Sequence, residues 1–140
     1  MKKSIIIVFS FLIFSCTPQK CPVLSYDELN RIAYDSDNSP YTGRCSVYLN
    51  DKISSIQQYL NGKDYGRWTF YYPNGKIETK AKFNQFGQRV GKWKYYYQNG
   101  KLKQTSVYYN GERSGIWTTY DSIGNLIDEI NYSSKMKPEQ

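Results

Sequence analysis

A tripeptide of the form Gly-x-Trp occurs three times at nearly equal spacing, and it constrains the fold more than any other feature of the chain. It stands at residues 66–68, 91–93 and 115–117, so the steps are 25 residues (66 to 91) and 24 residues (91 to 115). A step of 23 residues back from Gly66 reaches Gly43, where Cys45 takes the tryptophan position. Regular self-similarity over such a period is typical of stacked supersecondary units. The sequence therefore predicts about four tandem repeats within residues 41–132.

Each repeat contains two extended runs joined by a turn sequence. In the second repeat "WTFYY" leads through "PNGK" to "IETKAKF", and in the third "WKYYY" leads through "QNGK" to "LKQTSVYY". Asn-Gly supplies the positive φ angles that a tight hairpin turn requires. Since a single hairpin is marginal in water, the hairpins are expected to stack. The fold class predicted is all-β, a meandering antiparallel sheet built from about four β-hairpin repeats.

Alternation along a strand divides each first run into two faces. The face that carries the tryptophans is the predicted core, formed by Trp68, Phe70, Tyr72, Trp93, Tyr95, Tyr97 and Trp117. On the opposite face, Tyr71, Lys94 and Tyr96 form a candidate interaction surface, because tyrosine interspersed with cations is common in protein interfaces. The alternative is that these side chains pack against the neighbouring hairpin or are covered by lysine stems.

The N-terminal segment has the pattern of an export signal. Lys2 and Lys3 precede an apolar run at residues 5–14, which is shorter than the about 20 residues that span a bilayer. The order Ile13-Phe14-Ser15-Cys16 resembles the lipobox of bacterial lipoproteins. This resemblance implies that residues 1–15 are removed as a signal peptide and that Cys16 carries the lipid. An ordinary secretory signal or an uncleaved anchor is the alternative.

The export prediction sets expectations for the segments around the repeats. Residues 16–40 are expected to be a lipidated N-terminus and tether, and residues 133–140 a disordered tail. Thr17 stands where many inner-membrane lipoproteins have Asp, which favours the outer membrane, on its periplasmic or surface face. In an oxidising compartment Cys21 and Cys45 can form a disulfide. Equally, Cys45 can be a small buried residue and Cys21 a free thiol.

Composition narrows the classes of function. The chain has no histidine, which excludes Ser-His-Asp and Cys-His catalysis, and it has no clustered cysteines for a metal. The formal charge of +7 falls to +5 without Lys2 and Lys3, and the lysines are spread along the sequence. This charge is expected to be a solvated surface, with no nucleic-acid partner for an exported protein. The protein is predicted not to be an enzyme and to use neither a cofactor nor a metal.

The repeat pattern G-x-W-x-x-Y/F-Y-x-N-G-K resembles the MORN-repeat variants of bacteria, of the YwqK type, over about residues 41–132. Units two and three carry it fully, whereas unit one has Asn50-Asp51 in its turn and unit four has Ile123-Gly124-Asn125. The resemblance implies a sheet of stacked hairpins used for scaffolding or membrane-proximal interaction. We expect a membrane-anchored lipoprotein whose repeats bind an unknown envelope protein. The alternatives are an antitoxin or immunity-type inhibitor and a glycan- or lipid-headgroup-binding module.

Overall fold

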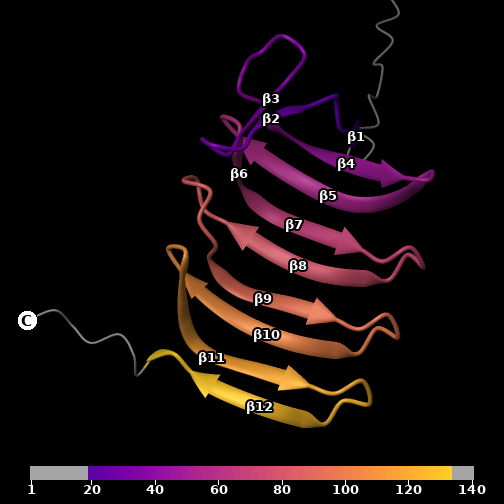
Figure 1. The fold of residues 1–140 in the computed structure, drawn as a ribbon, viewed down its shortest axis with the longest axis vertical. Coiled ribbons are helices and arrows are strands. Elements are labelled where there is room, and N and C mark those ends of the chain that lie inside the picture. Colours follow the sequence, from indigo (N-terminus) through magenta and orange to yellow (C-terminus); the bar gives the residue numbers. More distant parts are fainter. Residues whose placement is uncertain (1–18, 134–140) are drawn as a thin grey trace, which may run out of the picture.

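The computed structural model describes residues 19–133, which form one long curved sheet and one small hairpin (Figure 1). The strands are β1 (Gln19–Lys20), β2 (Ser25–Asp27), β3 (Ile32–Tyr34), β4 (Gly43–Leu49), β5 (Lys52–Leu60), β6 (Lys63–Asp64), β7 (Gly66–Tyr71), β8 (Ile77–Phe83), β9 (Gly91–Tyr96), β10 (Leu102–Tyr109), β11 (Glu112–Tyr120) and β12 (Leu126–Asn131). No helix in this part of the chain is long and apolar enough to cross a membrane.

Four hairpins lie side by side in chain order and make up the sheet (Figure 1). Unit one is β4–β5, unit two β7–β8, unit three β9–β10 and unit four β11–β12, and all of these pairings are antiparallel. Only β1, which pairs with β4, runs parallel to its neighbour. The structure confirms the predicted all-β fold of hairpin repeats in a meandering sheet.

The glycine that opens each Gly-x-Trp has a conformational reason. Gly66, Gly91 and Gly115 have φ angles of 66°, 68° and 58°, which lie in the left-handed region that side chains disfavour. Gly66 and Gly91 are the first residues of β7 and β9, so at these two positions the chain leaves a turn and enters the first strand of a unit. Gly115 instead lies within β11 (Glu112–Tyr120), just before its tryptophan.

The core is a single file of aromatic rings on one face of the sheet, which we call the Trp face. Consecutive rings have centroids 5.0 to 5.8 Å apart and mostly meet edge to face, in the order Tyr41, Tyr59, Trp68, Phe83, Trp93, Tyr108, Trp117 and Tyr132. Such aromatic contacts contribute roughly 0.5–1.5 kcal/mol each beyond the area that they bury. Neighbouring units are thus joined through their side chains as well as through the sheet.

Each tryptophan also bonds to the preceding unit through its indole nitrogen. The N–H groups of Trp68, Trp93 and Trp117 donate to the backbone carbonyls of Gln58, Lys82 and Val107 at 2.8, 3.2 and 3.0 Å. A buried indole needs such a partner, because an unpaired polar group is costly to bury. This bond fixes the ring over the strand behind it and explains why the repeat uses tryptophan at this position.

The predicted core residues fall into two groups. Trp68 and Trp93 are buried, and Phe70, Tyr95 and Trp117 pack against them. The structure places Tyr72 and Tyr97 differently from the prediction, because they stand outside this cluster and are only half-buried. Their hydroxyl groups reach backbone carbonyls of the following unit.

The segment before the repeats is folded from Gln19 onward, which differs from the tether expected over residues 16–40. β1 pairs with β4, and the β2–β3 hairpin places Ala33 in the core with 1% of its surface exposed. The Ala33 amide donates to the carbonyl of Gly62, and its carbonyl accepts from Tyr41. The predicted signal peptide (1–15), the lipidation site Cys16 and residues 134–140 of the predicted tail lie outside the described residues.

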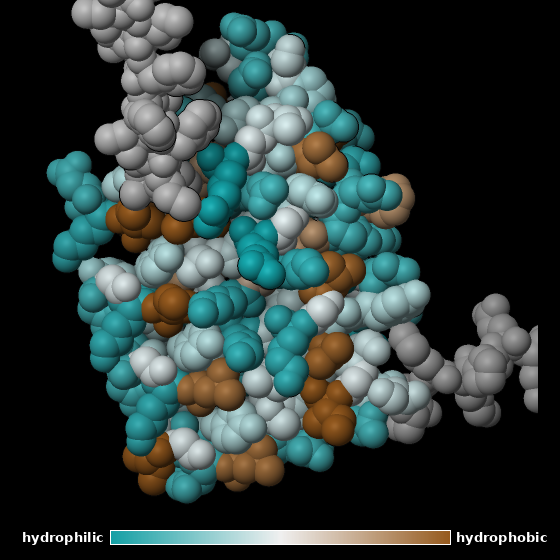
Figure 2. Space-filling view, turned by 180° about the vertical axis from the view of Figure 1, so that it is seen from behind, coloured by the Kyte–Doolittle hydropathy of each residue, from teal (hydrophilic) through white to brown (hydrophobic). Residues whose placement is uncertain are grey.

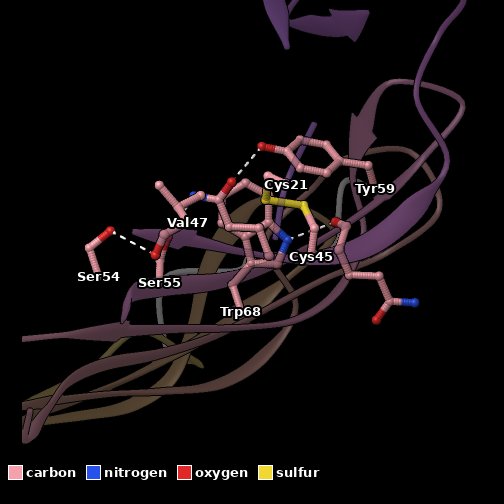
Figure 3. Close-up of a disulfide and its surroundings, with 9 residues drawn as sticks. Cys21, Cys45, Val47, Ser54, Ser55, Tyr59 and Trp68 are labelled. Atoms are coloured by element: carbon pink, nitrogen blue, oxygen red, sulfur yellow. Dashed lines mark hydrogen bonds between the residues drawn. A yellow bond between two sulfur atoms is a disulfide. The ribbon is translucent and has the colours of Figure 1, made fainter. Parts of the chain in front are cut away.

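A disulfide joins Cys21 to Cys45 (Figure 3). It attaches the segment before the repeats, residues 19–40, to unit one, and we call this segment the N-terminal cap. Cys45 occupies the tryptophan position of unit one and is 1% exposed, next to Tyr59 and Trp68 in the core. The sequence left two alternatives for the pair, and the structure has the bonded one. The bridge fills the core where unit one lacks a tryptophan, and it holds the residues after β1 against β4.

Candidate functional site

The face opposite the tryptophans, which we call the Lys face, is set by the strand register. On the first strands of units two and three, Thr69 and Lys94 alternate with the Trp-face residues and therefore point to the other side. The register places Lys80 opposite Thr69 on one side and opposite Lys94 on the other. Side chains from β7, β8 and β9 thereby form one continuous row across the sheet.

Five cations gather at the centre of this face and form what we call the cation cluster. Its members are Arg67, Lys80, Lys82, Lys92 and Lys94; all are exposed and, with Thr69, they line one shallow depression. Figure 2 shows hydrophilic side chains over much of the middle of the sheet. These cations are spread along the sequence, but the sheet brings them together on one face. Alternation puts every second residue of "KAK" and "KWK" on the same face, and the register brings the two segments together.

The cluster is electrostatically uncompensated. Lys80 lies directly opposite Lys94, and Arg67 directly opposite Lys82, an arrangement of like charges that destabilises a sheet. Within residues 19–133, no side chain of the cluster takes part in an ion pair or a hydrogen bond to the protein. Along the row from Lys94, the first carboxylate is that of Glu129, three strands farther on. Like charges that face one another and form no ion pair within the described residues point to a counter-charge on a binding partner.

A second feature, the tyrosine row, runs beside the cluster near the Asn-Gly turns. In each unit a tyrosine lies opposite an aliphatic residue, in the pairs Tyr48–Ile53, Tyr71–Ile77, Tyr96–Leu102 and Tyr120–Leu126. Figure 2 shows separate hydrophobic residues spaced down the side of the molecule that carries these turns. Tyr71 also lines a groove of about 240 Å³ together with Leu49 and Ile53. The row offers amphipathic contact area in several places instead of one large apolar patch.

The three residues predicted as an interaction surface do share one face. Lys94 is exposed within the cation cluster, whereas Tyr71 and Tyr96 are half-buried at equivalent places in the tyrosine row. Sequence reasoning missed the other four cations, because it did not use the pairing between units. The alternating lysines of β8 and β9 were the available signal.

The Trp face carries its cations differently. Arg89 lies 5.0 Å from the Trp93 ring centroid and 5.4 Å from that of Tyr108, whose hydroxyl accepts a hydrogen bond from it at 3.3 Å. Arg113 repeats this contact in unit four with Trp117 and Tyr132. These guanidinium groups contact aromatic rings, whereas the side chains of the cation cluster on the Lys face have no such contact among the described residues.

Unit two has a carboxylate where units three and four have these arginines. Asp64 is half-buried, and its desolvation raises the pKa of the carboxyl group, while Arg31 partly opposes that rise.

Burial also raises the pKa of Tyr95 to about 12, with Tyr108 as the next cause, so the hydroxyl group of this ring is neutral at physiological pH. Within residues 19–133, no three His, Cys, Asp or Glu side chains are grouped to hold a metal ion.

Two segments of the chain match a known repeat family. Residues 64–85 and 89–110 each match the MORN repeat variant, and they correspond to units two and three with their preceding turns. No curated protein and no solved structure shows a significant match to the chain. MORN repeats generally mediate protein or membrane interaction. The two matching units are also the ones that carry the cation cluster.

Proposed function

We propose that the protein is a non-enzymatic interaction module of the bacterial cell envelope, held at the membrane by lipid on Cys16. Its Lys face is the surface presented to a partner protein. The observation that carries this proposal is the uncompensated cation cluster beside the tyrosine row. Both features come from several units, so the complete surface exists only when the repeats are stacked.

The chemistry of the Lys face suits a protein partner. Tyrosine supplies a large, rigid and amphipathic contact at a low cost in side-chain entropy, and it is enriched in the centres of interfaces. Cations around such a centre steer a partner of opposite charge and fix its orientation more than they add affinity. The tyrosine row and the cation cluster supply these two components on one face.

The fold gives that surface a stiff support. Ring contacts and indole hydrogen bonds join each unit to the one before it on the opposite face. A partner that docks on the Lys face therefore meets side chains whose backbone is already ordered. Pre-ordering of this kind reduces the entropic cost of association.

The anchor defines where the module works. β1 begins at Gln19, three residues after Cys16. Three extended residues reach about 10 Å, so a lipid on Cys16 would keep the sheet next to the bilayer. We propose the outer membrane as the location, with an envelope protein as the partner.

Photo-crosslinking in cells tests this function. A photo-reactive amino acid is placed at Tyr71 in the tyrosine row and, as a control, at Phe86, an aromatic residue that is 63% exposed in the turn after β8. We expect a discrete protein adduct from position 71 and none from position 86. The adduct should weaken when Cys16→Ala releases the chain from the membrane fraction. A chain that reaches the membrane and yields no protein adduct at position 71 would refute the proposal.

A further inference from the structure

We infer that the partner reaches the cation cluster with an acidic protein segment that also carries apolar side chains for the tyrosine row. This inference rests on the proposed function, because it assumes that the Lys face binds a protein. It adds the chemistry of the recognised segment.

The cations are spaced like the carboxylates of a regular polypeptide. Directly opposite residues such as Lys80 and Lys94 have Cβ atoms roughly 4.5–5.5 Å apart, and residues two apart on a strand lie about 7 Å apart. Acidic residues three or four apart on a helix, or two apart on a strand, have nearly the same spacing. One acidic segment can therefore face several members of the cluster at once.

Repulsion between the cations of the cluster adds to the free energy that is gained when an acidic segment binds, because binding relieves this repulsion. In the unbound protein, Lys80 faces Lys94 and Arg67 faces Lys82 across neighbouring strands, and none of these side chains forms an ion pair within residues 19–133. An incoming carboxylate between two opposed cations removes part of that repulsion. The unbound state bears an energetic cost that the complex does not, which selects for a negatively charged partner.

The limits of the cluster favour a protein segment over a flat anionic membrane. The cations occupy β7, β8 and β9, whereas the same face continues through Thr105 and Thr118 to the carboxylate of Glu129. A membrane surface would have to meet the whole face, including that carboxylate. A compact acidic ligand fits the compact cluster.

The tyrosine row adds the apolar requirement. Tyr96 lies two residues after Lys94 on β9, and Tyr71 lies two residues after Thr69 on β7. Residues two apart on a strand point to the same side. The cation row and the tyrosine row are therefore parallel neighbours, and a segment that covers both needs an acidic stripe beside an apolar one.

The test combines crosslinking with charge reversal. A photo-reactive amino acid at Ile116, which lies on the Lys face and is exposed, reports contact without altering the cluster. Lys94→Glu reverses one cluster charge and places it opposite Lys80, so folding should be retained and the melting temperature should not fall. Lys63→Glu is the matched control, since Lys63 is an exposed lysine of β6 outside the cluster.

We expect Lys94→Glu to reduce the protein adduct at position 116 by at least about tenfold and Lys63→Glu to leave it unchanged. Reversal of an acidic residue to lysine in the crosslinked segment should restore the adduct with Lys94→Glu. An adduct that Lys94→Glu leaves intact would overturn the inference, while a protein adduct at position 71 would still support the proposed function. A lipid adduct at position 116 would instead assign the cluster to the membrane. Absence of adducts at both positions would refute the proposed function itself.

Discussion

The hydroxyl group of Tyr72 in unit two donates a hydrogen bond of 2.6 Å to the backbone carbonyl of Tyr96 in unit three. Tyr97 makes the equivalent bond to Tyr120 of unit four at 2.8 Å. The turn residues behave in the same way: the side chains of Asn74, Lys76, Asn99 and Lys101 donate to the carbonyls of Gln98, Asn99, Ser122 and Ile123. The Tyr-x-Asn-Gly-Lys motif therefore serves as a set of donors to the next unit.

Unit four lacks all three donors, and no further unit follows it among the described residues. Asp121, Ile123 and Asn125 stand where unit three has Tyr97, Asn99 and Lys101. The carboxylate of Asp121 instead accepts the backbone N–H groups of residues 123, 124 and 125 at 3.0, 2.7 and 2.8 Å. In unit four the turn residues therefore form hydrogen bonds within their own turn, where those of units two and three also bond to the following unit.

The first prediction concerns the tyrosine donors. Tyr72→Phe and Tyr97→Phe should each lower the free energy of unfolding by about 1 kcal/mol, because each leaves a carbonyl without its partner. Tyr109→Phe is the control, since this ring is 65% exposed, and it should change stability by less than about 0.5 kcal/mol. Urea unfolding measures all three variants. Equal losses in the three proteins would show that the turn bonds do not join the units.

A second prediction uses a buried hydroxyl group. Ser106 lies opposite Trp93 with no exposed surface, and its Oγ has no hydrogen-bond partner among the described residues. Ala81 holds the equivalent place opposite Trp68. Both positions need a small residue beneath the indole, but only unit three buries a hydroxyl there. Ser106→Ala should therefore raise the free energy of unfolding by about 1 kcal/mol.

The reciprocal variant controls for the site. Ala81→Ser should lower stability by about 1 kcal/mol, since it introduces the same unsatisfied group into unit two. Thermal or urea unfolding of both variants measures these changes in stability. A loss of stability in Ser106→Ala would mean that the hydroxyl is satisfied in solution, contrary to this account.

The repeats were predictable because their signals are local. Alternation, the Asn-Gly turns and the spacing of Gly66, Gly91 and Gly115 all lie within one unit or between successive units. The N-terminal cap was not predictable from such signals. β1 and β2 contain only two and three residues, and their positions depend on pairing with β4 and on the bridge to Cys45.

The candidate surface was only partly predictable for a related reason. The alternation that put Lys94 on the face opposite the tryptophans is readable along one strand. That Lys80 lies opposite Lys94 depends on the register between β8 and β9, which the turn at residues 84–90 determines. Sequence patterns within a unit carry no information on that register, so the cluster emerged only when the units were placed side by side.

The third prediction concerns the disulfide. Cys21 and Cys45 are separated by 24 positions in the sequence, and closure of a loop of this size stabilises a fold by about 3 kcal/mol on the chain-entropy model. The double variant Cys21→Ala/Cys45→Ala should lose stability of that order. A reducing agent should lower the melting temperature of the wild type but not that of the variant. Insensitivity of the wild type to reduction would mean that the bridge is absent in solution.

The fourth prediction concerns pH and Asp64. Burial raises the pKa of its carboxyl group above the ordinary value of 3.8, against the opposing effect of Arg31. Between the ordinary and the raised pKa, the folded state binds more protons than the unfolded state. Stability from this residue therefore falls as pH rises through that window, and the penalty is complete above it. Asp64→Asn should raise the free energy of unfolding at pH 7 and have little effect below the ordinary pKa.

Asp121 supplies the matched control with the opposite sign. Hydrogen bonds from its turn, first among them that of the Asn125 backbone N–H, lower the pKa of its carboxyl group. Its contribution is present above the ordinary pKa and is lost as pH falls through the lowered value. Asp121→Ala should therefore reduce stability at pH 7, and the reduction should shrink in acid. Urea midpoints between pH 3 and pH 7 compare the two variants; a parallel pH dependence for both would contradict the assigned burial of Asp64.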